Sequence, residues 1–224
     1  MDDIHFLKME KSLLAEKKMW TRLEVLNAAK KVFLKKGYAN TTIEEVAKTA
    51  GVSKGSIYLY FKNKDDLYLS LMIPVLARIN QSLKKLQKKV SNKKCQNYRD
   101  LVVSFYKHYK HIYKHDAEGI RVIQAFQMGD YISQLSETNR EALNKYTRNN
   151  FKIVRNIFSM AMDLNLISKA NPIILSDWFW STFIGVVQLE ESKLRGTKKD
   201  HVLNTLEEVF LLISNALRPG MAGS

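Results

Sequence analysis

Residues 51–68 read GVSKGSIYLYFKNKDDLY, and they decide how the rest of the chain is interpreted. The stretch combines two glycines and three lysines with an aromatic run. It could be a phosphate-binding loop, a short core helix, or a surface that meets a larger polyanion. A Walker A loop needs four residues between its glycines and a Lys-Ser/Thr pair after them. Gly51 and Gly55 enclose only three residues, so the phosphate-loop interpretation fails on spacing.

The core-helix interpretation is tested by projecting the stretch as a helix at about 100° per residue. Ile57 and Phe61, four residues apart, share one face. Lys54 and Tyr58 lie together on another side, and full burial would place a cationic stripe inside the protein. The pattern therefore favours an exposed surface.

Helix signals begin well before this stretch. Thr21 and Glu24 have the spacing of a capping box, and Gly37 is a stop signal, so we predict a helix between them. Residues 4–20 could form an additional amphipathic helix upstream. The predicted helix has an apolar stripe typical of a core-facing surface: Leu23, Leu26, Ala29, Val32 and Phe33.

Three further helix starts follow in quick succession. Thr41 or Thr42 caps a second helix that Gly51 ends, a third helix is predicted over residues 53–61, and Asn63 caps a fourth. Such dense punctuation predicts short helices set at angles around a small core. The residues predicted to form it are Phe33, Ile43, Val46, Ala47, Val52, Ile57 and Leu67.

The turn AGVS at residues 50–53 fits the connection of a helix-turn-helix unit. In such a unit the second helix enters the DNA major groove with its N-terminal end first. Ser53 would cap this helix and Gly55 would let the backbone approach DNA. The side chains placed to reach bases or phosphates are Lys54, Ser56, Tyr58 and Tyr60.

Residues 28–68, AAKKVFLKKGYANTTIEEVAKTAGVSKGSIYLYFKNKDDLY, carry a recognisable pattern of fixed positions without a gap. From about Thr21 to Met72 the chain resembles the DNA-binding domain of the tetracycline-repressor (TetR) family of transcriptional regulators. Val46 and Ser56 are conservative departures from the commoner residues. About a quarter of the chain carries the resemblance, which implies an all-α fold with a larger helical ligand-binding and dimerisation domain behind the helix-turn-helix domain.

The resemblance also implies roles for individual positions. Thr42 is expected to cap the second helix and touch a phosphate, and Tyr60 and Lys64 to clamp phosphates. The plain alternatives are a cap only for Thr42, a solvated charge for Lys64, and a packing role for Gly55. The other expected DNA contacts are made by Ser53, Lys54, Gly55, Ser56 and Tyr58.

The net charge of +14 favours a polyanionic partner but does not mark the helix-turn-helix unit. Residues 1–67 hold 13 basic and 9 acidic residues, whereas residues 78–115 hold 11 basic and one acidic. The excess is therefore concentrated elsewhere, partly in the lysine cluster of residues 84–94. A solvated face accounts for that cluster as simply as a binding surface does.

Residues 101–115 project as an amphipathic helix with a histidine seam beside its apolar face. The seam consists of His108, His111 and His115. Two histidines four apart can share a metal ion, but the only nearby partner ligand is Asp116. We therefore predict that the seam lies at the boundary of the apolar face or at the rim of a pocket, and we predict no metal site or cofactor.

Two apolar helices close the chain. Residues 178–189, WFWSTFIGVVQL, are apolar nearly all round, and residues 200–217 carry apolar residues on more than one face. This surplus predicts a subunit interface, and the resemblance implies a homodimer formed through the last two helices. It also implies an apolar effector pocket, for which the candidate lining residues are Tyr109, Gln127, Trp178, Trp180 and Phe183.

Other function classes find little support. Cys95 is the single cysteine, which excludes an internal disulfide, and no catalytic constellation is evident, so we do not expect an enzyme. The apolar stretch 178–189 is shorter than the roughly 20 residues that span a bilayer, and the N-terminus lacks signal-peptide character. A cytoplasmic protein without a membrane partner is expected.

These observations, together with the resemblance to the TetR family, predict a two-domain regulator. Residues 18–78 form a TetR-type DNA-binding domain, and residues 79–217 bind an effector and dimerise. The expected function is a repressor, released from a palindromic double-stranded DNA operator by a small, hydrophobic effector. One alternative is a DNA-bound organiser of chromosomes or cell division, and another is a ligand carrier or enzyme with a vestigial DNA-binding domain. Pro74 is expected to kink the fourth helix, which links the two domains.

Overall fold

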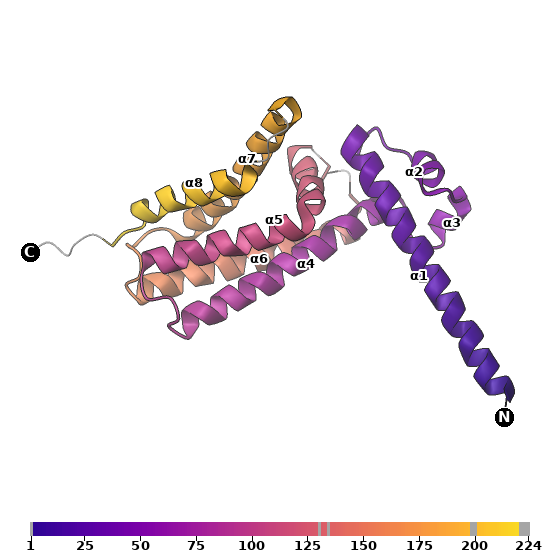
Figure 1. The fold of residues 1–224 in the computed structure, drawn as a ribbon, viewed down its shortest axis with the longest axis horizontal. Coiled ribbons are helices and arrows are strands. Elements are labelled where there is room, and N and C mark those ends of the chain that lie inside the picture. Colours follow the sequence, from indigo (N-terminus) through magenta and orange to yellow (C-terminus); the bar gives the residue numbers. More distant parts are fainter. Residues whose placement is uncertain (1, 130, 134, 198–200, 220–224) are drawn as a thin grey trace, which may run out of the picture. The chain divides into compact units, whose positions relative to one another are not determined.

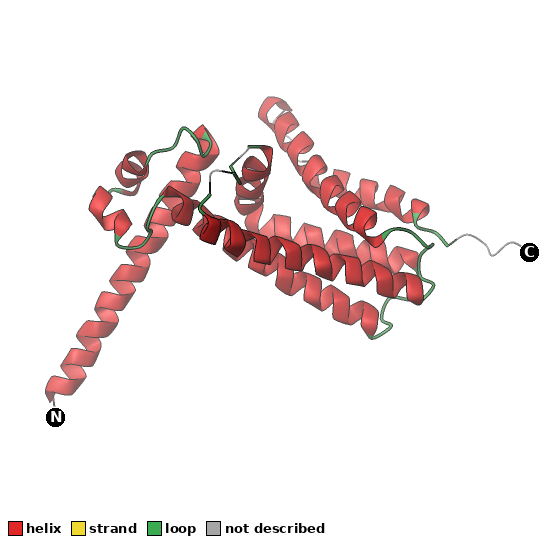
Figure 2. Ribbon diagram, turned by 180° about the vertical axis from the view of Figure 1, so that it is seen from behind, coloured by secondary structure: helices red, strands yellow, loops and turns green. Residues whose placement is uncertain are grey.

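The computed structural model describes residues 2–129, 131–133, 135–197 and 201–219, with side chains from residue 12 onward except at 195–197. Every regular element in these ranges is an α-helix (Figure 2). The prediction of an all-α fold is therefore confirmed. The helices are α1 Asp2–Lys36, α2 Ile43–Ala50, α3 Lys54–Tyr58, α4 Lys64–Ser91, α5 Tyr98–Met128, α6 Glu137–Asp163, α7 Pro172–Thr197 and α8 Val202–Ala216.

The chain forms two compact units that share three long helices. The first unit comprises residues up to Ile73 together with Arg121–Glu141, and the second comprises Pro74–Ile120 and the chain from Ala142 onward. Helix α4 therefore passes from one unit to the other at Pro74, which lies inside the helix. These units are defined by packing, and the predicted functional domains, residues 18–78 and 79–217, stay a prediction.

Helix α1 differs from its prediction. It runs unbroken from Asp2 to Lys36, so the predicted start at Thr21 is wrong. The Thr21 hydroxyl donates instead to the carbonyl of Lys17, 3.0 Å away. No glycine or proline precedes Gly37, so nothing interrupts the helix before the left-handed Gly37 (φ 76°) ends it. The N-terminal part of α1 extends beyond α2 and α3 (Figure 1), and Leu23, predicted as core, is exposed.

The short helices of the first unit have the predicted caps. Thr42 caps α2, with Glu45 completing the capping box, and Asn63 Oδ1 accepts from the amide of Asp66 at the start of α4 (2.8 Å). Helix α3 is shorter than predicted, because it ends at Tyr58 rather than at Phe61. The amide of Phe61 still donates to the carbonyl of Ile57 (3.0 Å), so the chain continues in a turn.

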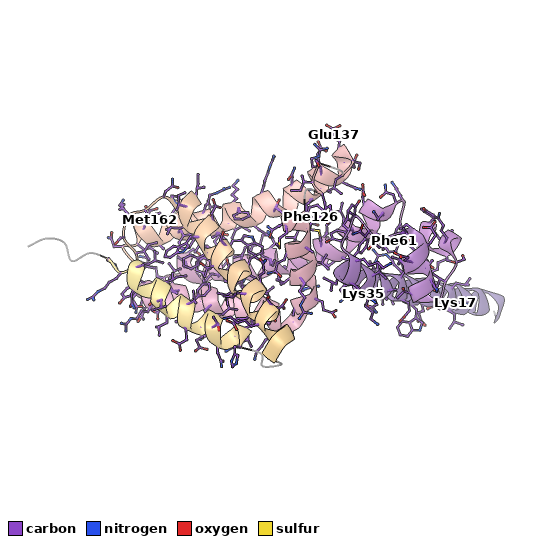
Figure 3. All side chains as sticks on the ribbon, turned by 90° about the horizontal axis from the view of Figure 1, so that it is seen from above. Lys17, Lys35, Phe61, Phe126, Glu137 and Met162 are labelled. Carbon is purple, nitrogen blue, oxygen red and sulfur yellow. The ribbon has the colours of Figure 1, made fainter. Side chains whose placement is uncertain are left out.

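The core of the first unit is close to the predicted one. Phe61 is buried among the helices of this unit (Figure 3), and Val52 is only half-buried although it was predicted as core. The remaining predicted core residues are buried, namely Phe33, Ile43, Val46, Ala47, Ile57 and Leu67.

An aromatic cluster extends this core to the C-terminal part of α5. The ring of Tyr68 meets Phe33 edge-on at 4.7 Å and lies 5.6 Å from Phe126 between ring centroids. The hydroxyl of Tyr68 donates to the carbonyl of Val122 (2.9 Å). Residues 121–141, predicted to belong to the effector domain, therefore pack with the helix-turn-helix region.

The second unit is built around α4, α5 and α6, which run side by side (Figure 1). Helix α5 is broken at Asp116, whose backbone is non-helical (φ −156°, ψ 55°). Its carboxylate accepts from the amide of Gly119 (2.9 Å) and pairs with Arg78 of α4. The sequence placed a helix end at this residue, and the structure places a kink there.

The core of the second unit is a stack of aromatic rings. Phe105 stacks on Phe158 at 5.0 Å, and Phe179 meets both rings edge-on. Tyr109 stacks on Phe183 with a centroid distance of 4.5 Å. The rings come from α5, α6 and α7, so they join the three helices into one core.

Helices α7 and α8 pack on each other and leave much apolar surface uncovered. Within the described residues, Pro172–Leu194 is long and apolar enough to cross a membrane by length and composition, although only 28% of that window is buried. The apolar stretch is therefore longer than the residues 178–189 predicted from the sequence. The predicted start of the last helix at Asp200 lies outside the described residues. The large exposed apolar residues of the two helices are Ile173, Ile174, Trp178, Leu189, Leu211 and Leu212.

Candidate nucleic-acid interface

Helix α3 is held at its N-terminal end by a tight turn. Gly51 adopts the left-handed conformation (φ 68°) that ends α2, and its amide and that of Val52 donate to carbonyls of the last turn of α2. Ser53 then caps α3, because its hydroxyl oxygen accepts from the amide of Ser56 (3.0 Å). The hydroxyls of Ser53 and Ser56 lie 2.8 Å apart. The turn and its cap orient the first turn of α3 without support from a large core.

Lys54 and Tyr58 lie on one exposed side of α3. The Lys54 ammonium pairs with the Glu44 carboxylate of α2 and lies 5.9 Å from the centroid of the Tyr58 ring. The hydrogen bond with Glu44 raises the pKa of Lys54, and the same bond lowers the pKa of Glu44. Both partners are at least half exposed, so solvent screens the pair. Another anion can therefore replace Glu44 as the partner of Lys54.

Gly55 has no packing reason to be a glycine. It is exposed, and a Cβ atom added there would meet only the Ser53 hydroxyl, at an ordinary 3.7 Å. Its backbone is not in the left-handed region. The packing alternative considered for Gly55 therefore has no support in the chain's own contacts.

Lys64 has a role that the sequence did not reveal. Its ammonium donates to the carbonyl of Tyr38 (3.0 Å) and lies 4.4 Å from the centroid of the Tyr38 ring. The Tyr38 hydroxyl donates to Asp65, and burial together with this bond raises the pKa of Tyr38. Lys64 is thus half-buried and ties the loop after α1 to the start of α4, so it is more than a solvated charge.

The remaining predicted DNA contacts lie on the surface of the same region. Thr42 is exposed and accepts from the amide of Glu45 (3.2 Å), so its cap role is established. Tyr60 is half-buried, and its ring lies 6.4 Å from that of Phe61. The candidate DNA contacts thus lie between the N-cap of α2 at Thr42 and the first residue of α4 at Lys64.

The candidate effector residues do not form one group. Tyr109 and Phe183 are buried and stack on each other, and Trp180 is half-buried with its centroid 5.8 Å from Phe183. Trp178 is exposed, and Gln127 is exposed in the first unit. Two of the five residues therefore lie inside a closed aromatic core and two on the surface.

The histidine seam is divided in the same way. His108 is buried, while His111 and His115 are exposed with ring centroids 4.3 Å apart. Across the described part of the chain, no group of three or more His, Cys, Asp or Glu side chains could hold a metal ion. The boundary position predicted for the seam matches this arrangement.

Helices α2 and α3, with the Gly51 turn between them and an exposed first turn on α3, define a helix-turn-helix protein of the DNA-binding class. Residues 25–71 match the family model described as bacterial regulatory proteins of the tetR family. This region of the chain is therefore similar to the DNA-binding part of that family, and the match does not extend over the rest of the chain. The match falls on the same α1–α4 region from which the resemblance was argued.

The chain is also similar to individual relatives over part of its length. A fatty acid metabolism regulator protein of Bacillus subtilis is 34% identical over 71 residues, which is 32% of this chain and 35% of the relative. The chain thus aligns with about a third of that relative's length. The crystal structure of the TetR-family regulator PfmR of Thermus thermophilus covers 89% of this chain and 96% of its own, with 16% identity and a TM-score of 0.68.

A second solved structure is that of FadR from Bacillus subtilis in complex with stearoyl-CoA. It covers 88% of this chain and 99% of its own, with 19% identity and a TM-score of 0.62. At such low identity, both structural matches establish the fold over nearly nine tenths of the chain and not its ligand.

Proposed function

We propose that the chain is a transcriptional regulator that binds a palindromic DNA operator as a homodimer and acts as a repressor. The observation that carries the proposal is the first turn of α3. Lys54, Ser56 and Tyr58 lie on a helix whose start is fixed by the Gly51 turn and the Ser53 cap. No contact within the chain requires a glycine at position 55. A backbone that must come close to a partner is the simplest reason for such a glycine.

We propose specific roles for the neighbouring residues. Lys54, Ser56 and Tyr58 face base edges, while Ser53 and Gly55 bring the backbone close to the groove. Thr42, Tyr60 and Lys64 contact phosphates, which set the register of the protein on DNA. Lys64 retains its bonds to the loop after α1 in this role, because an ammonium has three donors.

Dimerisation is proposed through α7 and α8. Ile174, Trp178 and Leu189 leave a row of exposed apolar side chains along α7, and Leu211 and Leu212 do the same on α8. Exposed apolar surface of this extent on two adjacent helices is typical of a subunit interface. Two copies in a four-helix arrangement would present two α3 helices to successive turns of the major groove.

The effector is proposed to be a small apolar molecule that binds the 79–217 domain and lowers operator affinity. FadR of Bacillus subtilis, similar in fold, was solved in complex with stearoyl-CoA. In this chain an apolar ligand would enter by separating ring pairs such as Tyr109 and Phe183, with Trp178, Trp180 and Gln127 as the other candidates. We place the protein in the cytoplasm and assign it no catalytic activity.

Selection from random duplex DNA tests this function. We expect the full chain to enrich an inverted repeat, with half-sites centred about one helical turn, roughly 10 base pairs, apart. A dimer is the natural reader of such symmetry. Enrichment of no motif, or of a single unpaired half-site, would contradict the proposal.

A further inference from the structure

The second unit contains a basic groove between α4 and α5. Its volume is about 500 Å³, within the range of small-molecule sites. Of its twelve lining residues, none is acidic and seven are lysine, arginine or histidine. The basic residues are Arg78, Lys85 and Lys89 from α4 and Lys107, His108, His111 and His115 from α5.

The charges of this groove are only partly compensated. Arg78 pairs with Asp116, and the Lys89 ammonium donates to the Ser104 hydroxyl (2.8 Å). Among the described residues, no ion pair involves Lys85 or Lys107. Cations gathered in one groove repel each other, and a bound anion would relieve that repulsion. The groove therefore has the electrostatic character of an anion site.

A buried side chain points to a ligand independently of these charges. His108 lines the groove and is 5% exposed. Its Nδ1 lies 2.6 Å from the Ser82 hydroxyl, but its Nε2 is buried without a hydrogen-bond partner. When Ser82 donates to Nδ1, the neutral ring carries its proton on Nε2. A buried N–H donor without an acceptor is costly, and an anionic oxygen would satisfy it.

Protonation of the ring is not the alternative solution. Burial, with a contribution from His111, lowers the pKa of His108 to about 3. The ring is therefore neutral near pH 7, and it can serve an anion only as a hydrogen-bond donor. Lysine side chains then supply the charge.

We propose that the α4–α5 groove binds a small molecule with two or more negative charges on phosphate or carboxylate oxygens, held by Lys85, Lys107 and His108. Arg78, Lys89 and Ser104 complete the surroundings of the anion. The groove lies within the second unit and is separate from the aromatic core proposed for the apolar effector.

Calorimetric titration of the full chain with pyrophosphate and with citrate, at constant ionic strength, tests the site. We expect one anion per chain and a higher unfolding temperature in its presence, because the anion binds the folded state. The double variant Lys85→Gln/Lys107→Gln should bind at least tenfold more weakly. Whichever anion binds more tightly identifies phosphate or carboxylate as the preferred chemistry.

The matched control is Lys84→Gln/Lys114→Gln, which removes the same charge from the same two helices outside the groove. It should bind within twofold of the unchanged protein. In nitrogen-15 spectra of histidine, the Nε2 signal of His108 should shift on binding. Equal weakening in both double variants, many weak sites per chain, or no saturable binding of either anion would overturn the proposal.

Discussion

Helix α3 and the α4–α5 groove both display positive charge, but they hold it in opposite ways. On α3, a single lysine is balanced by Glu44 and placed by the Ser53 cap and the Gly51 turn before it. In the groove, several lysines converge around a buried, neutral His108. The richer concentration of charge is therefore not the DNA-binding motif, and geometry distinguishes a DNA-reading helix from a small-anion site where net charge does not.

The same contrast sets what each unit requires for its function. The first unit depends on local backbone geometry, because α2 and α3 are short and defined by caps. The second unit depends on packing and, in the proposed function, on a partner subunit that covers the apolar side chains left exposed on its last two helices. Substitutions that affect only one of these two requirements test this difference between the units.

The largest effect is expected from Leu212→Glu on α8. Leu212 is 68% exposed, so a charge there leaves the single chain folded but opposes burial in an interface. We expect monomers in light scattering and at least a hundredfold loss of operator affinity, because two half-sites can no longer be bound together. Met128→Glu, at a site 72% exposed in the first unit, is the control and should remain dimeric. A dimeric Leu212→Glu protein would remove α8 from the interface.

The next effect is the pH dependence of stability in the second unit. The pKa of His108 is about 3 in the folded chain and about 6.5 in the unfolded one, so the unfolded state binds the extra proton. The neutral His108 therefore lowers stability little above pH 6.5, and the free energy of unfolding falls as the pH drops from 6.5 toward 3. Between pH 7.5 and 5 this loss of unfolding free energy amounts to about 2 kcal/mol.

Denaturant unfolding at several pH values measures this contribution. His108→Gln should be less sensitive to pH over this range by that amount. His111→Gln, at an exposed site on the same helix, should keep the sensitivity of the unchanged protein. Identical pH profiles for the unchanged protein and His108→Gln would show that the buried ring is protonated without cost.

A pair of glycines sharpens the comparison inside the first unit. Gly51 needs its left-handed backbone, so Gly51→Ala should destabilise the chain by about 1 kcal/mol. Gly55→Ala should leave stability unchanged or raise it by about 0.5 kcal/mol, because its Cβ has room. Its operator affinity should nevertheless fall about tenfold, which is about 1.4 kcal/mol. An unchanged affinity for Gly55→Ala would remove the main support for close approach of α3 to DNA.

The smallest expected effect concerns the cap of α2. Thr42→Ala removes the acceptor for the amide of Glu45 and should cost about 1 kcal/mol of stability. Thr42→Ser keeps the hydroxyl and should restore most of it. Thermal unfolding compares the two variants, and equal loss in both would mean that the methyl group, not the cap, matters at this position.

The sequence was most informative where local chemistry decides structure. The caps Thr42, Ser53 and Asn63 and the stop at Gly51 are short-range signals, and each was located from neighbouring residues alone. Thr21 had an equally good capping pattern and failed, because a continuous helix competes with any cap inside it. Local signals identify where a helix can begin, and not whether it must.

Long-range packing accounts for what could not be predicted. The bond from Tyr68 to Val122 joins residues 54 positions apart, so the packing of residues 121–141 with the helix-turn-helix region could not be read from neighbouring residues. The Lys64 tie to Tyr38 and the unpartnered Nε2 of His108 likewise depend on which helices meet. Periodicity placed His108 at the edge of an apolar face, but only the α4–α5 contact shows what lies beside it.

The central claim is that the exposed side of α3 reads base sequence. Selection from random duplex DNA, repeated in parallel with the unchanged protein and Tyr58→Ala, tests it most directly. We predict that Tyr58→Ala alters the preferred bases at symmetric positions of both half-sites, while their spacing stays the same. The same motif with the same base preferences in both selections would show that this side of α3 does not read the DNA.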